Sequence, residues 1–360
     1  MTFSTLNNLA LIATLFVFNQ IVSAQSDKYL SNAQIFKLMS DSKVAYNVTP
    51  LSELDDSLKK SNFSVLMFPQ LTPLVKFPLV KKSEDDKSTL SSFEFQEEAW
   101  TFLNKGEEYF GKRDFINAKE FYSKAIENDP SFYLAALYLG DCYLQEKDYN
   151  TALSYYQKAN AINPNDYSTW YFQSTALRNL GEYEKAVDCY REALLNKPRH
   201  QNIMKALNGS QEILGITVDN SEFVPKSLAL KKGDDVFIYF SEEGGTEWLA
   251  YANAKAIWLG ETAIPGLKEP TVKSLWSTTE EKQAIISLLD GYYSSKENDK
   301  NKNDKYLEKL YAITQDGLLD SFIIYEIGSR INPNITLILP DEIKEDIRKY
   351  IRKYVVVDKN

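Results

Sequence analysis

The fold is decided by the stretch FYLAALYLGDCYLQEKDYNTALSYYQKANAINP (132–164), the middle one of three similar blocks. The block before it is AWTFLNKGEEYFGKRDFINAKEFYSKAIENDP (99–130), and the block after it is DYSTWYFQSTALRNLGEYEKAVDCYREALLNKP (166–198). The residues that recur every 34 positions are Pro130, Pro164 and Pro198, Tyr122, Tyr156 and Tyr190, Ala118, Ala152 and Ala186, and Ala125, Ala159 and Ala193. Self-similarity at this period indicates repeated pairs of helices joined by short turns.

The recurring residue types fit a stack of helix pairs. Ala118 and Ala125 are seven residues apart and therefore fall on one face of the second helix of their block. Their small side chains allow a neighbouring helix to approach closely, and Tyr122 fills the space beside them. Each block ends in a proline, which cannot extend a helix. Because one pair cannot bury its apolar face alone, the pairs are predicted to stack into a right-handed solenoid.

The first helix of each block carries a second pattern. Its residues are Phe102, Lys105, Gly106 and Tyr109 in the first block, Ala136, Leu139, Gly140 and Tyr143 in the second, and Trp170, Gln173, Ser174 and Leu177 in the third. This arrangement resembles the tetratricopeptide repeat, in which these places hold an aromatic residue, a Leu-Gly pair and a tyrosine. Lys105 and Gln173–Ser174 depart from that pattern, so the first helices there are expected to pack less tightly.

The resemblance implies a concave groove that binds peptides and is lined by the first helices. The expected lining residues are Trp100, Leu103, Glu107, Phe110, Leu134, Leu137, Tyr138, Asp141, Leu144, Tyr171, Thr175 and Arg178. Family members that grip the C-terminal carboxylate of chaperones use Lys and Asn at places that here hold Leu103, Glu107, Tyr138, Ser168 and Phe172. That grip is therefore absent. An apolar, aromatic and slightly acidic groove suits an amphipathic helix or an extended apolar peptide.

The residues before the repeats suggest export and a possible ligand within the chain. LALIATLFVF (9–18) is an apolar run of signal-peptide length, and Ala24 ends a Val-Ser-Ala sequence suited to cleavage. We expect a secreted or periplasmic protein with no membrane span in the mature chain. The apolar segment 63–80 contains three prolines and should lie extended. It either occupies the groove or packs on the solenoid edge or the C-terminal domain.

The sequence therefore predicts a mainly α-helical chain with five parts. They are a signal peptide over 1–24, an irregular segment and linker over 25–96, three repeats over 97–198, a capping helix over 199–216, and a mostly helical domain with one or two short strands over 217–360. DDVFIYF (234–240) reads as a strand and EWLAYANAKAIWLGE (247–261) as a buried helix. NITLILP (334–340) is either a short strand or a buried turn.

Composition and motifs argue against several functions. A formal net charge of −9 with no basic face argues against a nucleic-acid partner. The sequence has one histidine, His200, and two separated cysteines, Cys142 and Cys189. A zinc site built from Cys and His ligands is therefore not expected, and both cysteines are expected to be free thiols. The sequence contains no phosphate-binding loop, nucleophile elbow or cofactor motif. We expect a non-enzymatic adaptor or scaffold that binds a protein or peptide; the alternative is an enzyme or small-ligand receptor with its site in 217–360.

Overall fold

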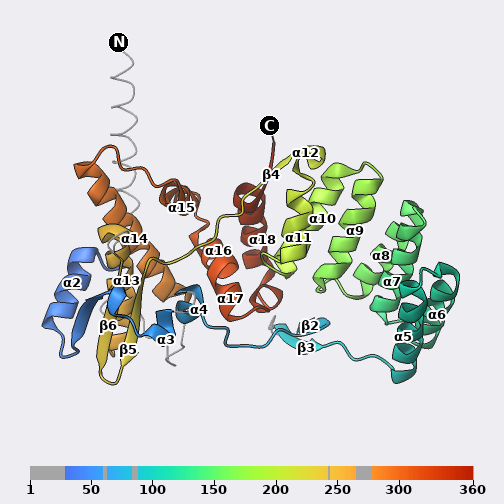
Figure 1. Cartoon of the computed structure of the whole chain (residues 1–360), viewed down its shortest axis with the longest axis horizontal. Helices are drawn as coiled ribbons and strands as arrows, with labels where there is room; N and C mark the ends of the chain where they lie inside the picture. Colours follow the sequence, from blue (N-terminus) through green and yellow to red (C-terminus); the bar gives the residue numbers. More distant parts are fainter. Residues whose placement is uncertain (1–28, 60–62, 83–87, 242–243, 265–276, 360) are drawn as a thin grey trace, which may run out of the picture. The chain divides into compact units, whose positions relative to one another are not determined.

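The computed structural model describes residues 29–59, 63–82, 88–241, 244–264 and 277–359 (Figure 1). The predicted signal peptide lies outside these residues. The described chain is mainly helical, as predicted. It divides into two compact units: the described residues up to Pro69 join Phe223–Ile323, and Gln70–Glu222 joins residues 324–359. The sequence had suggested one domain over 217–360, whereas the structure places residues 324–359 with the repeats.

Six helices form the repeats of the second unit. They are α5 (Glu97–Gly111), α6 (Phe115–Asn128), α7 (Tyr133–Gln145), α8 (Tyr149–Ile162), α9 (Tyr167–Asn179) and α10 (Tyr183–Asn196). In the first two repeats, Asp114 and Asp148 cap the second helix by accepting a backbone N–H from three residues later. The residue before the second helix's cap position has a positive φ in each repeat, at Arg113, Lys147 and Gly181. The turn between the two helices therefore has a left-handed residue at the same position in all three repeats.

Small residues and tyrosines join the helices of each pair. Ala118, Ala152 and Ala186 are fully buried. The Tyr156 ring lies directly on Gly140, where an added Cβ would come 2.6 Å from the ring, and Tyr122 lies on Gly106 in the same way. Glycine is required at these two places because the ring occupies the volume of a side chain. The helix contact inferred from the sequence is therefore confirmed.

The C-terminal segment covers the end of the repeats. The capping elements are α11 (Gln201–Asn208) and α12 (Gln211–Leu214), strand β4 (Ile216–Val218) with its antiparallel partner β7 (Val356–Asp358), and α17 (Ser329–Ile331) and α18 (Asp341–Tyr350). Arg199 donates two hydrogen bonds to the buried Glu326 carboxylate from its Nε, at 3.0 and 3.1 Å, and pairs with it again through Nη2 at 2.6 Å. Tyr350 donates to the same carboxylate. This buried, charge-assisted network fixes residues 324–359 on the last repeat.

The segment NITLILP does not form a strand. It contains a 3-10 turn over Ile335–Leu337. The side-chain oxygen of Asn332 accepts the backbone N–H of Asn334, which bends the chain before the turn begins. Pro340 directly precedes α18.

The first unit combines a small sheet with a helix pair. Its elements are α2 (Asn32–Asp41), β1 (Tyr46–Pro50), α3 (Asp56–Lys59), α4 (Phe63–Met67), β5 (Ser227–Lys232), β6 (Asp235–Phe240), α13 (Gly245–Gly260), α14 (Thr278–Asn298), α15 (Lys305–Gln315) and α16 (Leu319–Phe322). The sheet order is β1-β6-β5, with β1 parallel and β5 antiparallel to β6. Ala252 and Ala256 of α13 pack on Val236 and Ile238 of β6. The strand and the buried helix predicted from the sequence are both present.

A buried charged group joins α13 to α14. Lys255 pairs with both Glu280 and Glu281, and Tyr251 donates a hydrogen bond to Glu281. All four residues are buried. Because the opposite charges lie on facing helices, the group fixes how this pair is aligned.

The tight helix contact in the repeats can be tested at Ala152. Ala152→Leu should lower the free energy of unfolding by about 1–3 kcal/mol, because the site has no room for a larger side chain. Ala161→Leu, the same change at an exposed place on the same helix, is the control and should be nearly neutral. Chemical denaturation followed by circular dichroism measures both. Equal stabilities would contradict the helix pairing described here.

Candidate functional site

Three of the expected groove residues turn out to be core residues. Leu103, Leu134 and Leu137 are 2%, 4% and 1% exposed and belong to the hydrophobic core of the repeats. Leu134 and Leu137 nevertheless line a pocket together with residues 74–78 of the same chain, so the chain itself covers part of the expected groove. The remaining expected residues keep at least part of their surface accessible: Trp100, Glu107, Phe110, Tyr138, Asp141, Leu144, Tyr171, Thr175 and Arg178.

Two carboxylates occupy equivalent places in the first two repeats, and a tyrosine holds each of them. The Tyr122 hydroxyl donates to Glu107, and the Tyr156 hydroxyl donates to Asp141 at 2.6 Å. The same tyrosine that lies on the first-helix glycine thus reaches the carboxylate of the next residue. The position of each carboxylate follows directly from helix packing.

The third repeat lacks this pair. Thr175 stands where the carboxylates stand in the other repeats, and Ser174 replaces the glycine. The buried hydroxyl of Tyr190 has no hydrogen-bond partner among the described residues. Arg178 instead donates to Ser210 beside the capping helices, at 2.8 Å. This pairing of a tyrosine with a first-helix carboxylate is therefore confined to the first two repeats.

The electrostatics of this acidic part are unusual. Burial, with a further contribution from Glu107, raises the pKa of Asp141 to about 7, although the Tyr156 hydrogen bond acts in the opposite direction. Burial also raises the pKa of Tyr138 to about 12, and the charges of Glu107, Asp141 and Asp166 add to the effect. Among the described residues, neither Glu107 nor Asp141 forms an ion pair with a lysine or arginine. The concave face thus carries negative charge at Glu107, and at Asp141 above about pH 7, that no basic side chain in the described part of the chain neutralises.

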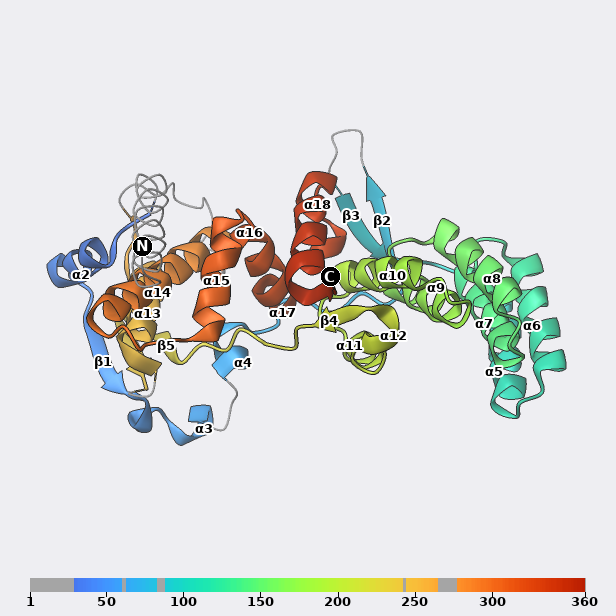
Figure 2. The same cartoon turned by 90° about the horizontal axis from the view of Figure 1, so that it is seen from above.

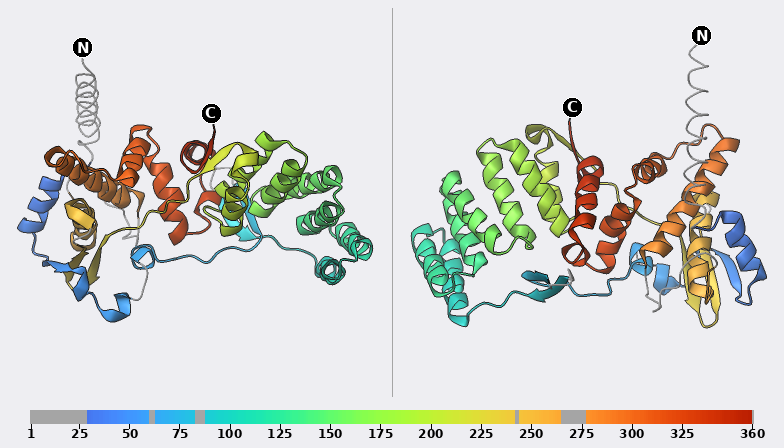
Figure 3. Two further views of the ribbon diagram at one scale, coloured as in Figure 1. Left: turned by 45° about the horizontal axis from the view of Figure 1, so that its top comes forward. Right: turned by 180° about the vertical axis from the view of Figure 1, so that it is seen from behind.

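An internal segment, here called the strap (residues 71–82 and 88–95), lies against the repeats. Its hairpin consists of β2 (Pro78–Lys82) and β3 (Ser88–Ser92). Lys82 pairs with Asp341 at the start of α18. Figure 2 shows the hairpin beside that helix. Before the hairpin, the backbone N–H of Val75 donates to the Asn334 side chain at 3.0 Å, and the Asn163 side chain donates to the carbonyl of Pro78. Figure 3 shows the strap running along the repeats towards α5.

Aromatic contacts anchor the other end of the strap. Phe95 packs on Trp100, Phe132 and Tyr133, with ring centroids 5.6, 4.4 and 5.8 Å away. Phe77 contacts Phe95 and Trp100. Trp100, expected to line an open groove, therefore contacts the chain's own strap instead.

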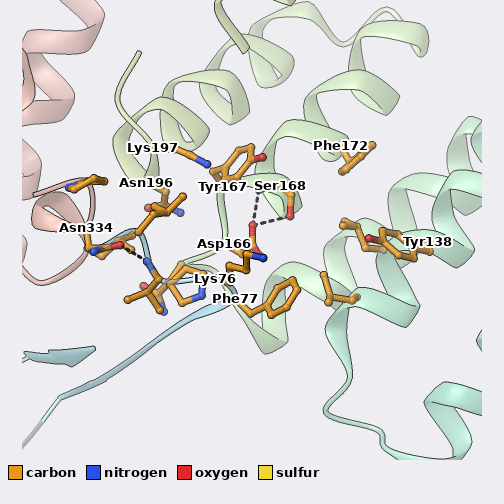
Figure 4. Close-up of a pocket in the computed structure, with 18 residues that line it drawn as sticks. Lys76, Phe77, Tyr138, Asp166, Tyr167, Ser168, Phe172, Asn196, Lys197 and Asn334 are labelled. Atoms are coloured by element: carbon orange, nitrogen blue, oxygen red, sulfur yellow. Dashed lines mark hydrogen bonds between the residues drawn. The ribbon is translucent and has the colours of Figure 1, made fainter. Parts of the chain in front are cut away.

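A pocket of about 350 Å³ lies between the strap and the concave face (Figure 4). Leu74 and Phe77 of the strap form one side, and Tyr138 and Phe172 of the first helices form another. The lining also includes Asp166, which accepts hydrogen bonds from Tyr133 and Ser168. Tyr138, Ser168 and Phe172 are three of the five places at which the resemblance located the carboxylate grip. The strap thus borders the expected groove.

The apolar segment 63–80 does not behave as one ligand. Phe68 packs on Phe223 in the first unit, whereas residues 74–78 line the pocket in the second. Phe77 belongs to the segment 63–80 that the sequence analysis named as a possible occupant of the groove. Asn334 was missed as part of the pocket wall, because it meets this segment only through contacts with residues far away in the sequence.

The comparisons with known proteins concern the repeats. Two family models, both described as tetratricopeptide repeat, match residues 103–167 and 143–207. Residues 103–207 therefore contain tetratricopeptide repeats, which confirms the resemblance that the sequence analysis gave for 97–198. No curated protein matches the chain.

Solved structures similar to this chain are single tetratricopeptide-repeat domains. The OM64 domain of Arabidopsis is 19% identical, with 32% of this chain and 94% of that one covered and a TM-score of 0.31. The first domain of human RPAP3 is 22% identical over 32% of this chain and 91% of its own, with a TM-score of 0.31. The second, solved with the HSP70 peptide SGPTIEEVD, is 21% identical over 31% and 92%, with a TM-score of 0.30.

Membrane-spanning helices and metal sites are both absent from the described residues. These residues contain no helix that is both long enough and apolar enough to cross a membrane. They also contain no group of three or more His, Cys, Asp or Glu side chains arranged to hold a metal ion.

The raised pKa of Asp141 has a consequence for stability. Between about pH 4 and pH 7 the folded chain holds a proton on Asp141 that the unfolded chain has released, so this residue lowers stability as the pH rises through that range. Asp141→Asn should therefore raise the free energy of unfolding by about 1–2 kcal/mol at about pH 8 and by much less at about pH 4.

Denaturation of wild type and variant across this pH range measures the effect. Glu127→Gln, which removes an exposed carboxylate from α6, is the control and should show no such dependence. A gain for Asp141→Asn that is the same at both pH values would show that Asp141 ionises normally.

Proposed function

We propose that this chain is a non-enzymatic adaptor that binds a peptide segment of a partner protein on the concave face of its repeats. Tetratricopeptide repeats present such a face, and here it is accessible and aromatic at Tyr138, Tyr171 and Phe172. Aromatic side chains provide large contact areas at a low cost in conformational entropy. The face therefore suits protein recognition better than it suits chemistry.

The position of the strap is the observation that carries this proposal. Residues 74–78, Leu-Val-Lys-Phe-Pro, lie beside Leu137, Tyr138 and Phe172 without forming a strand or helix with the repeats. The repeats thus already accommodate an extended apolar chain. The space that remains beside it, about 350 Å³, is the volume of a few side chains of a second segment.

The observations on the first unit favour packing over catalysis. Its buried charged group is Lys255 with Glu280 and Glu281. These side chains satisfy one another within the pair α13 and α14, so helix packing alone accounts for them. An enzyme or small-ligand receptor in 217–360 therefore gains no support from this group.

Export is the second part of the proposal, and it rests on the sequence of residues 1–24. An apolar run followed by Val-Ser-Ala is typical of a signal peptide. The mature protein should begin at Gln25 or within a few residues of it. N-terminal sequencing of protein purified from its native source measures this directly, and an intact Met1 would refute export by this route.

The binding function can be tested at two half-buried aromatic residues. Replacing both Tyr138 and Phe172 with Ala removes accessible aromatic surface while leaving the leucines below in place. Partner binding should weaken by a factor of about ten or more, since central aromatic residues dominate such interfaces. The melting temperature should fall only slightly.

The measurement is a pull-down with the mature chain, read by mass spectrometry, followed by titration of the captured partner. A matched control replaces Ile116 and Tyr183, two exposed apolar residues of second helices, with Ala. Capture that is equal for all three proteins would exclude the concave face as the binding site.

A further inference from the structure

Among the described residues, no lysine or arginine pairs with the two carboxylates of the concave face. Glu107 is exposed and Asp141 is partly buried, and both come from first helices. Each accepts a tyrosine hydroxyl, which orients the carboxylate but does not neutralise it. Glu192, another partly buried carboxylate of this unit, is by contrast paired with Arg348.

Bringing two like charges together in a partly desolvated place is unfavourable. A lysine or arginine from a partner would relieve that cost and form charge-assisted hydrogen bonds, which are stronger than neutral ones. Tyr138 lies close to both carboxylates and offers an aromatic face, which also attracts a cation. Phe110 and Leu144 follow one turn later on the same two helices and add apolar surface.

The strap provides a sequence that already lies on the neighbouring part of this face. Its residues 74–78 are apolar except for one lysine, Lys76. Apolar side chains interrupted by a basic residue are thus compatible with the surface next to Tyr138. An acidic segment or a C-terminal carboxylate would be repelled by Glu107 and Asp141.

We propose that the concave face selects a partner segment that combines apolar side chains with a lysine or arginine, and that the cation binds beside Glu107, Asp141 and Tyr138. This inference rests on the proposed function, because it names the chemistry of the segment bound at the same site. This charge preference is the opposite of that of the family members that grip the C-terminal carboxylate of chaperones. The tyrosine hydrogen bonds make the site rigid before the partner arrives.

A random library of 12-residue peptides displayed on phage tests the proposal with the full chain as bait. The charge variant carries Glu107→Gln and Asp141→Asn, which keep an oxygen for each tyrosine hydroxyl. The control variant carries Glu120→Gln and Glu127→Gln, which remove two exposed carboxylates from α6 and change the net charge equally. Selected peptides are then synthesised, and their affinities are measured by fluorescence anisotropy.

Selection on the wild-type chain should enrich apolar peptides that contain a lysine or arginine. Their affinity should fall at least about tenfold for the charge variant and stay within about twofold for the control variant. Replacing the peptide's basic residue by glutamine should weaken binding to the wild type but cause little further loss with the charge variant.

Three results would overturn the inference. Peptides that depend on Tyr138 and Phe172 but show no basic preference would refute the charge selection and leave the proposed function intact. Basic peptides that lose affinity equally with the charge and control variants would show attraction to the overall negative charge only. A library that yields no peptide dependent on Tyr138 and Phe172 would refute both the inference and the proposed function.

Discussion

The contact between a tyrosine ring and a glycine is the constraint on which the repeats depend. Tyr122 and Tyr156 lie where a side chain at Gly106 or Gly140 would otherwise stand. This contact brings the two helices of a repeat together and excludes larger residues. It also determines where the tyrosine hydroxyl emerges, which is beside the residue after the glycine. A packing requirement in the core thereby produces a polar group at the concave face.

The consequences of that contact differ between repeats. With a carboxylate after the glycine, as at Glu107 and Asp141, the hydroxyl finds an acceptor and the acid is held in place. In the third repeat the acceptor is missing, and the Tyr190 hydroxyl stays unpaired among the described residues. A buried hydroxyl without a hydrogen-bond partner costs free energy. The third repeat therefore lacks the stabilisation that this hydrogen bond gives to the first two.

The sequence predicts those parts of the structure that depend on local patterns. The 34-residue period and the strand at Asp235–Phe240 both depend on residues near one another in the chain. The sequence indicated Leu134 and Leu137 for the groove, but it could not show that residues 74–78 of the same chain lie beside them. The ion pair of Arg199 with Glu326 joins residues 127 positions apart and has no local signal.

The strap is the part of the candidate site whose contacts could not be predicted from the sequence. Its three phenylalanines, Phe77, Phe93 and Phe95, look like ordinary apolar residues of an irregular segment, yet they pack on the beginning of α5 and α7. Because the strap covers this end, the apolar part of the concave face is shared between the chain and any partner. The acidic part at Glu107 and Asp141 is not shared in this way. Affinity in such a face would come from aromatic surface, whereas the choice among partners would come from charge, since an unpaired carboxylate penalises every segment that brings another negative group.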